Sequence, residues 1–275
     1  MAMAMNGSLF VYDPSRNLCG FASPKVGKKA LVLIGGLTDG LMPTVWTTEI
    51  TDRIALQGWC TVQVLLQSSY SGYGTCSLDT DAEDLRELCS WLVGEGVETV
   101  VLLGHSTGCQ DAVHVLRNGW VPGVKGIVLQ APVSDRECMA LDPGTSEALV
   151  RAQALVADGK GNELLATGDH QVPITASRFC SLAGKGGLDD MFSSDLTDEE
   201  LKTILGHVTV PTLLVLSGAD QYVPDHIDAS ALAGRLGAAI GPHAKTMVIG
   251  GANHGIKAEG KTEFLEAVQE FVFGL

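Results

Sequence analysis

The chain is poor in basic residues and has neither a long apolar run nor a paired-cysteine motif. Lys and Arg number 18 among 275 residues against 32 Asp and Glu, so the formal net charge is −14. An acidic surface repels phosphate backbones and anionic membrane surfaces, which excludes nucleic-acid binding as a function class. No apolar run approaches the ~20 residues of a membrane-spanning helix, and we expect no membrane partner.

The seven cysteines occur singly, without a Cys-x-x-Cys pair. An odd, scattered set in a chain of this size indicates reduced thiols rather than a disulfide framework or a zinc site. Residues 1–10 contain neither the basic nor the apolar part of a secretion signal. We therefore expect a cytoplasmic protein without a bound metal.

What the chain does have is enough apolar surface for one large core, since 45% of its residues are hydrophobic and 18% are charged. Short apolar runs alternate with helical patterns, as in a mostly parallel sheet covered by helices on both faces. The predicted strands are 30–34, 60–65, 99–103, 124–129, 212–216 and 245–249. The predicted helices are 44–56, 81–92, 107–117, 147–157, 198–205, 228–236 and 263–272. We predict a single α/β domain over 1–275.

One long stretch lacks a convincing buried strand. Between 134 and 207 only helical pieces and Gly-rich turns occur. A long insertion between two core strands is usually functional, and we predict a helical cap at about 136–207, between late strands of the sheet. Capping-box spacing at Thr80–Glu83 and Thr197–Glu200 predicts two helix starts.

The pentapeptide Gly104–Gly108 matches Gly-x-Ser-x-Gly, with Ser106 at its centre. In a nucleophile elbow, a strand runs into a tight turn that lifts the serine hydroxyl clear of the sheet, and a helix follows. Here the apolar run 99–103 precedes the pentapeptide and a helical pattern begins at Thr107. Strand, turn and helix together favour a nucleophilic serine over an ordinary tight turn.

A nucleophilic serine needs a base and an orienting carboxylate, which follow it along α/β-hydrolase chains in the order acid, then histidine. His254 follows the last predicted strand in a Gly-rich loop, and Asp220 follows the strand before it. Asp135 stays open as the alternative acid, because it also follows a core strand. Asp225 is better explained as a helix N-cap.

The other six histidines fit the base less well. His105 adjoins Ser106 and cannot easily reach its hydroxyl, and His114 lies in the following helix. Four more are interpreted as surface residues of loops or of the insertion: His170, His207, His226 and His243.

Two backbone N–H groups should receive the oxyanion of the reacting ester. One is expected from Thr107, and the second from the glycine-rich loop 35–40, with Leu37 preferred and Thr38 next. A plain glycine turn without an oxyanion hole is the alternative explanation of that loop.

The segment 68–74 follows another strand and holds Tyr70 and Tyr73. A pocket wall and an ordinary surface turn are equally good interpretations of it. As substrate-binding residues we predict Thr38, Tyr70, Tyr73 and His105.

Residues 255–262 match the pattern of a phosphate-binding P-loop. Only thirteen residues follow this segment, whereas a P-loop normally opens a sheet with further strands to come. A loop that enters the last helix accounts for the glycines, so nucleotide binding is not expected.

Four blocks carry a resemblance to a known family: 35–40, 68–74, 104–111 and 129–137. With them, the chain resembles the serine α/β-hydrolase family that includes the fungal siderophore (fusarinine-type) esterases. The resemblance implies the α/β-hydrolase fold and a triad of Ser106, Asp220 and His254. It does not fix the substrate, because fold-level likeness does not transfer one.

The expected function is hydrolysis of a small-molecule ester through an acyl-enzyme, without metal or organic cofactor. The resemblance implies the ester of a hydroxamate siderophore as one candidate substrate. A ligand-binding receptor or carrier on the same fold, and an acyltransferase or thioesterase, are the alternatives. A serine nucleophile argues against haloalkane dehalogenases and epoxide hydrolases, which need a carboxylate at that position. The sequence leaves the oligomeric state open.

Overall fold

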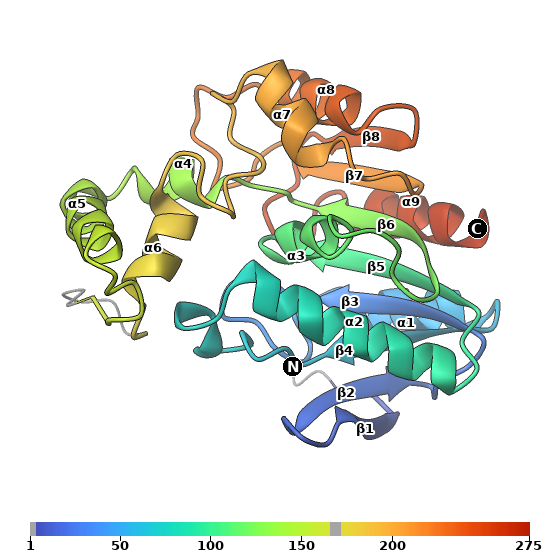
Figure 1. Cartoon of the computed structure of the whole chain (residues 1–275). Coiled ribbons are helices and arrows are strands. Elements are labelled where there is room, and N and C mark those ends of the chain that lie inside the picture. The colour runs from blue at the N-terminus through green and yellow to red at the C-terminus, as the bar shows by residue number, and fades with distance from the viewer. Residues whose placement is uncertain (1–3, 166–171) are drawn as a thin grey trace.

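An eight-stranded sheet with helices on both faces forms the centre of the molecule (Figure 1). The computed structural model describes residues 4–165 and 172–275, so the predicted surface residue His170 lies outside the described residues. Along the sheet the order is β1-β2-β4-β3-β5-β6-β7-β8. The strands are β1 (Ser8–Asp13), β2 (Leu18–Ser23), β3 (Lys29–Ile34), β4 (Trp59–Val64), β5 (Thr99–His105), β6 (Val124–Gln130), β7 (Thr212–Ser217) and β8 (Ala244–Ile249).

Most of this sheet is parallel, as predicted. Every neighbouring pair from β4 to β8 runs parallel, whereas β1 pairs antiparallel with β2 and β2 antiparallel with β4. The β1–β2 hairpin at the sheet edge was not predicted. Residues of β1 are mostly exposed or half-buried, so this strand lacks the apolar run by which the core strands were found.

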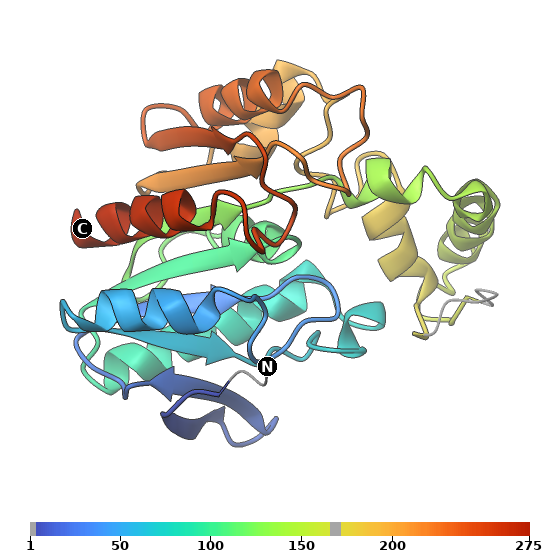
Figure 2. The same cartoon turned by 180° about the vertical axis from the view of Figure 1, so that it is seen from behind.

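The helices divide between the two faces of the sheet. The face with α2 (Leu78–Gly94), α3 (Gly108–His114) and α8 (Ala229–Ile240) buries the larger apolar cluster. The opposite face is covered by α1 (Thr47–Ala55) and α9 (Lys261–Phe273), as the two views show (Figures 1 and 2). Strands buried on both faces explain the nearly continuous apolar runs of the sequence.

Three helix-start predictions have different outcomes. The capping box of Thr197 and Glu200 is present at the start of α7 (Asp198–Leu205). Thr80 does not begin α2, because Ser77 is the N-cap and its side chain accepts a hydrogen bond from the Thr80 N–H. The N-cap of α8 is Asp228 rather than Asp225, and its carboxylate accepts from two backbone N–H groups of the first turn.

Between β6 and β7 the chain forms α4 (Asp135–Met139), α5 (Pro143–Ala157), α6 (Ala176–Ala183) and α7. Helices α5 and α6 stand apart from the sheet layers (Figures 1 and 2) and share an apolar cluster of their own. Leu37 and Tyr73, from loops of the sheet domain, pack against that cluster. Helix α7 instead packs on α8. The insertion therefore reaches the loops at which the candidate site was predicted.

None of the helices in the described part of the chain is both long and apolar enough to cross a membrane.

Candidate active site

Ser106 lies in the sharp turn between β5 and α3, with a φ of 56°. A serine rarely adopts this left-handed region, and such strain is typical of functional turns. Both flanking glycines are required by close backbone contacts. A Cβ at Gly104 would lie 2.2 Å from the Gly108 carbonyl oxygen, and one at Gly108 would lie 2.5 Å from the Ile34 oxygen. The turn therefore has the geometry of a nucleophile elbow.

The side chains of His254 and Asp220 are hydrogen-bonded to each other. The distance from His254 Nδ1 to Asp220 Oδ2 is 2.7 Å, and both residues are buried. Asp220 comes from the loop after β7, and His254 from the loop after β8. This bond orients the imidazole and leaves Nε2 to accept a proton.

Asp135, the alternative acid, points to another partner. Its Oδ2 accepts a hydrogen bond of 2.8 Å from Gln110 Nε2. Burial raises its pKa to about 7, and the charge of Asp189 adds to the effect. The His254 imidazole is thus paired with Asp220, while Asp135 belongs to a different polar group.

Gln130, at the end of β6, connects the serine turn with the histidine loop. Its backbone oxygen accepts from the Ser106 N–H at 3.0 Å, and its Nε2 donates to the His254 carbonyl at 2.8 Å. Gln221 Oε1 accepts from the His254 N–H at 3.1 Å. Sequence reasoning missed both glutamines. The available signal for Gln130 was a polar residue at the end of an apolar strand, and that for Gln221 was its position directly after Asp220.

His105, predicted to bind substrate, faces the protein interior. Its Nδ1 is hydrogen-bonded to Gln130 Oε1, and its ring centroid lies 5.0 Å from that of His254. Burial, together with the charge of His254, lowers its pKa to about 4. His105 is therefore neutral at pH 7, and its ring packs beside that of His254.

The loop that follows β3 folds over Ser106. Asp39 closes it, because its N–H donates to the Gly36 oxygen at 3.0 Å and its Oδ2 accepts from the Gly36 N–H at 2.8 Å. A Cβ at Gly36 would lie 2.7 Å from Ser106 Cβ. In the described part of the chain, no backbone carbonyl accepts from the N–H of Leu37 or of Thr107. Both groups are thus free to donate to a ligand.

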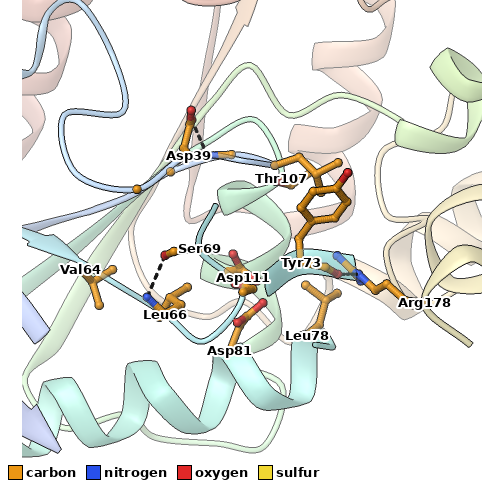
Figure 3. A pocket seen from close by; sticks show the side chains of 15 residues that line it. Asp39, Val64, Leu66, Ser69, Tyr73, Leu78, Asp81, Thr107, Asp111 and Arg178 are labelled. Carbon is orange, nitrogen blue, oxygen red and sulfur yellow. Dashed lines mark hydrogen bonds between the residues drawn. The ribbon is translucent and has the colours of Figure 1, made fainter. Parts of the chain in front are cut away.

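A pocket opens beside these two residues and is lined by Leu37, Thr107, Tyr73, Asp81, Asp111 and Arg178, among others (Figure 3). Two residues predicted to bind substrate lie elsewhere. Tyr70 is 53% exposed and packs over Gly40, and Thr38 is exposed at a φ of 71°. Asp81, Asp111 and Arg178 were not singled out from the sequence, because they come from three separate helices.

The strand order, the strained serine turn and the loops after β7 and β8 define an α/β-hydrolase fold. A solved structure titled "Siderophore hydrolase EstB from Aspergillus fumigatus" superimposes with a TM-score of 0.79 at 24% sequence identity, covering 98% of this chain and 96% of that one. The likeness confirms the predicted fold class.

The chain belongs to the family described as "Protein of unknown function (DUF1749)", whose model matches residues 1–274. A relative from Schizosaccharomyces pombe, "UPF0613 protein PB24D3.06c", is 34% identical over 88% of this chain and 85% of its own length. "Fusarinine C esterase sidJ" from Aspergillus fumigatus is 28% identical over 75% of each chain.

Proposed function

We propose that this protein is a carboxylic ester hydrolase that works through an acyl-enzyme on Ser106. The observation that carries the proposal is the buried hydrogen bond between His254 and Asp220, in loops that follow neighbouring strands, beside a strained serine turn. The name of the fusarinine C esterase, a relative over three quarters of the chain, supports ester hydrolysis as the reaction.

The proposed reaction begins when Ser106 Oγ attacks the ester carbonyl carbon and His254 Nε2 takes the hydroxyl proton. Asp220 holds the imidazole and stabilises its charged form. The N–H groups of Leu37 and Thr107 donate to the oxyanion, and each such donor is typically worth ~10²–10³ in rate. The alcohol then leaves with the proton, and a water molecule, deprotonated by His254, hydrolyses the acyl-enzyme.

A small-molecule ester is the proposed substrate, and hydroxamate siderophore esters come first for screening because of the relative named above. We place the reaction in the cytoplasm. All seven cysteines are unpaired, which fits a reducing compartment.

Replacement of the serine tests the mechanism. Ser106→Ala removes the nucleophile, so kcat for any ester that the native protein hydrolyses should fall by about 10⁴-fold or more. Ser90→Ala is the matched control, because Ser90 lies exposed on α2 and bonds only to the Arg86 carbonyl. Steady-state kinetics on the two variants compare the rates. Unchanged turnover by the Ser106 variant would contradict the proposal.

A further inference from the structure

Two carboxyl groups form one end of the pocket beside the serine turn. Asp81 comes from α2 and Asp111 from α3, and they are 3% and 6% exposed. Both line the same pocket as Leu37 and Thr107, the two proposed oxyanion donors. Figure 3 shows the two carboxyls close together, with Tyr73 and Arg178 around the same space. If the ester carbonyl lies at Leu37 and Thr107, a substituent that extends into the same pocket meets the two carboxyl groups.

One oxygen of each carboxyl is left without a partner. Among the residues that the structure describes, neither Asp81 Oδ1 nor Asp111 Oδ1 has a hydrogen-bond donor. A buried polar atom without a partner is rare, because it loses its bonds to water and gains nothing in return. Two such atoms on the wall of one pocket indicate that a ligand supplies the donors.

The electrostatics of the pocket favour a positive donor. Burial raises the pKa of Asp81 to about 6 and that of Asp111 well above its usual range. Because the two acids lie side by side, the negative charge on one opposes ionisation of the other, and a cation bound between them would stabilise that charge.

The neighbouring cation, Arg178, lowers the pKa of both acids but makes its hydrogen bonds to other groups. Arg178, from α6, donates through Nη1 to Asp189 at 2.5 Å and through Nε to the Tyr73 carbonyl at 3.0 Å. Its guanidinium is therefore paired with a third carboxylate. Asp84, also on α2, accepts from Arg16 and Gln67 instead.

We propose that this pocket is a specificity subsite for a short cationic hydrogen-bond donor, in the simplest case an alkylammonium group carried by the ester substrate. The proposal rests on the proposed ester hydrolysis and names a chemical class for one part of its substrate. An ammonium group would donate to both unpartnered oxygens. A carboxylate would meet the negative charge, and an alkyl group would leave both oxygens unpaired. Sites built for hydrogen bonding reject ligands that lack the donor strongly.

The first experiment compares esters that differ only at the end of the acyl chain. Ethyl 3-aminopropanoate, ethyl butanoate and ethyl hemisuccinate carry a cationic, a neutral and an anionic end on chains of similar length. A second pair, 3-(dimethylamino)propyl acetate and 4-methylpentyl acetate, places the charge on the alcohol. We expect kcat/KM for the cationic ester to exceed that for its neutral counterpart by about tenfold or more in one series.

Variants then locate the preference. Asp111→Asn should reduce the ratio of cationic to neutral kcat/KM by about tenfold. Asp79→Asn is the matched control, since Asp79 lies on α2, the helix of Asp81, and its exposed side chain pairs with His114 of α3. Where a melting curve indicates that the Asp111 variant is unfolded, Asp81→Asn takes its place. No preference in either series, or a preference that both variants retain, would overturn the proposal.

Binding separates this proposal from the ester hydrolysis on which it rests. In the Ser106→Ala protein, nuclear magnetic resonance titration should detect propylammonium but not propanoate, and Asp111→Asn should abolish the difference. Equal binding of the two ions would contradict the subsite. A protein that binds propylammonium selectively but hydrolyses no ester retains the subsite and loses the hydrolase function.

Discussion

At the scale of single residues, the serine turn depends on two groups that contribute no reacting atom. Gly36 brings the loop after β3 against Ser106, and Gln130 ties the Ser106 N–H to the His254 loop. Catalytic groups must be held within a fraction of an ångström of their working positions. Substitutions here should therefore reduce activity more than they reduce stability.

Gly36→Ala tests the close approach of the loop. Its Cβ would lie 2.7 Å from Ser106 Cβ and 3.2 Å from Ser106 Oγ, so the loop or the serine must move. Loss of one well-placed oxyanion donor alone costs about 10²–10³ in kcat, and we expect a fall of that size in ester turnover. Gly234→Ala, in open space on α8, is the control and should retain full activity. Full activity of the Gly36 variant would refute the packing argument.

The identity of the acid is settled by comparing two variants. Asp220→Asn should lower kcat by about 10⁴, because the amide fails to hold the histidine in the useful tautomer. Asp135→Asn should keep most of the activity, since Asp135 bonds to Gln110. Steady-state ester kinetics decide between them. The reverse pattern would make Asp135 the acid.

His105 gives stability a pH dependence with a definite sign. Its pKa is about 4 in the folded protein, because burial disfavours the charged ring, against 6.5 for an ordinary histidine. The contribution of neutral His105 to the free energy of unfolding is therefore complete above pH 6.5. As the pH falls from 6.5 to 4, the unfolded chain binds a proton that the folded protein does not bind, so this contribution is lost. The full loss is on the order of 3 kcal/mol.

Denaturant unfolding of His105→Asn checks this contribution. Between pH 7 and pH 4.5 the free energy of unfolding should fall less in the variant than in the native protein. Parallel curves for the two proteins would mean that His105 titrates normally.

At the scale of elements, the start of α7 was marked by a local sequence signal. The α7 capping box was predicted from the spacing of Thr197 and Glu200. In the structure, each of their side chains accepts a hydrogen bond from the other residue's backbone N–H. The short helix α6 was missed, because Thr175 caps its start but is followed three residues later by Arg178 rather than by the Glu or Gln of a capping box. The hairpin β1–β2 was missed because its outer strand is largely exposed.

Thr197→Ala should destabilise the protein by about 1 kcal/mol, as the loss of an N-cap typically does. Thr203→Ala is the control on the same helix, since its exposed hydroxyl bonds only to the Glu199 carbonyl. Urea unfolding measures both. An equal effect of the two substitutions would mean that the capping box adds nothing to the stability of α7.

At the scale of the whole molecule, the sequence predicted the mostly parallel sheet and named Asp220 and His254, which the fold joins by a hydrogen bond. Ser106 follows β5 within a recognisable pentapeptide, and Asp220 and His254 follow β7 and β8, in the chain order expected of this fold. Asp81, Asp111 and Arg178 could not be predicted in this way. They meet because α2 packs on α3 and Arg178 of α6 lines the same pocket, and no local sequence pattern records that arrangement.

The insertion between β6 and β7 contributes to the pocket and packs on the sheet domain. It supplies Arg178 to the pocket, while its apolar cluster packs on Leu37 and Tyr73 from the sheet domain. The extent of this cap at 136–207 stays a prediction. The residues that line the pocket thus come from both the sheet domain and the insertion.

The most direct test of Ser106 as a nucleophile is the intact mass of the protein after treatment with a fluorophosphonate. An activated serine should take up one adduct, and Ser106→Ala should take up none. Ser90→Ala should be labelled like the native protein. An unlabelled native protein, or an adduct that persists on the Ser106 variant, would contradict a catalytic nucleophile at this position.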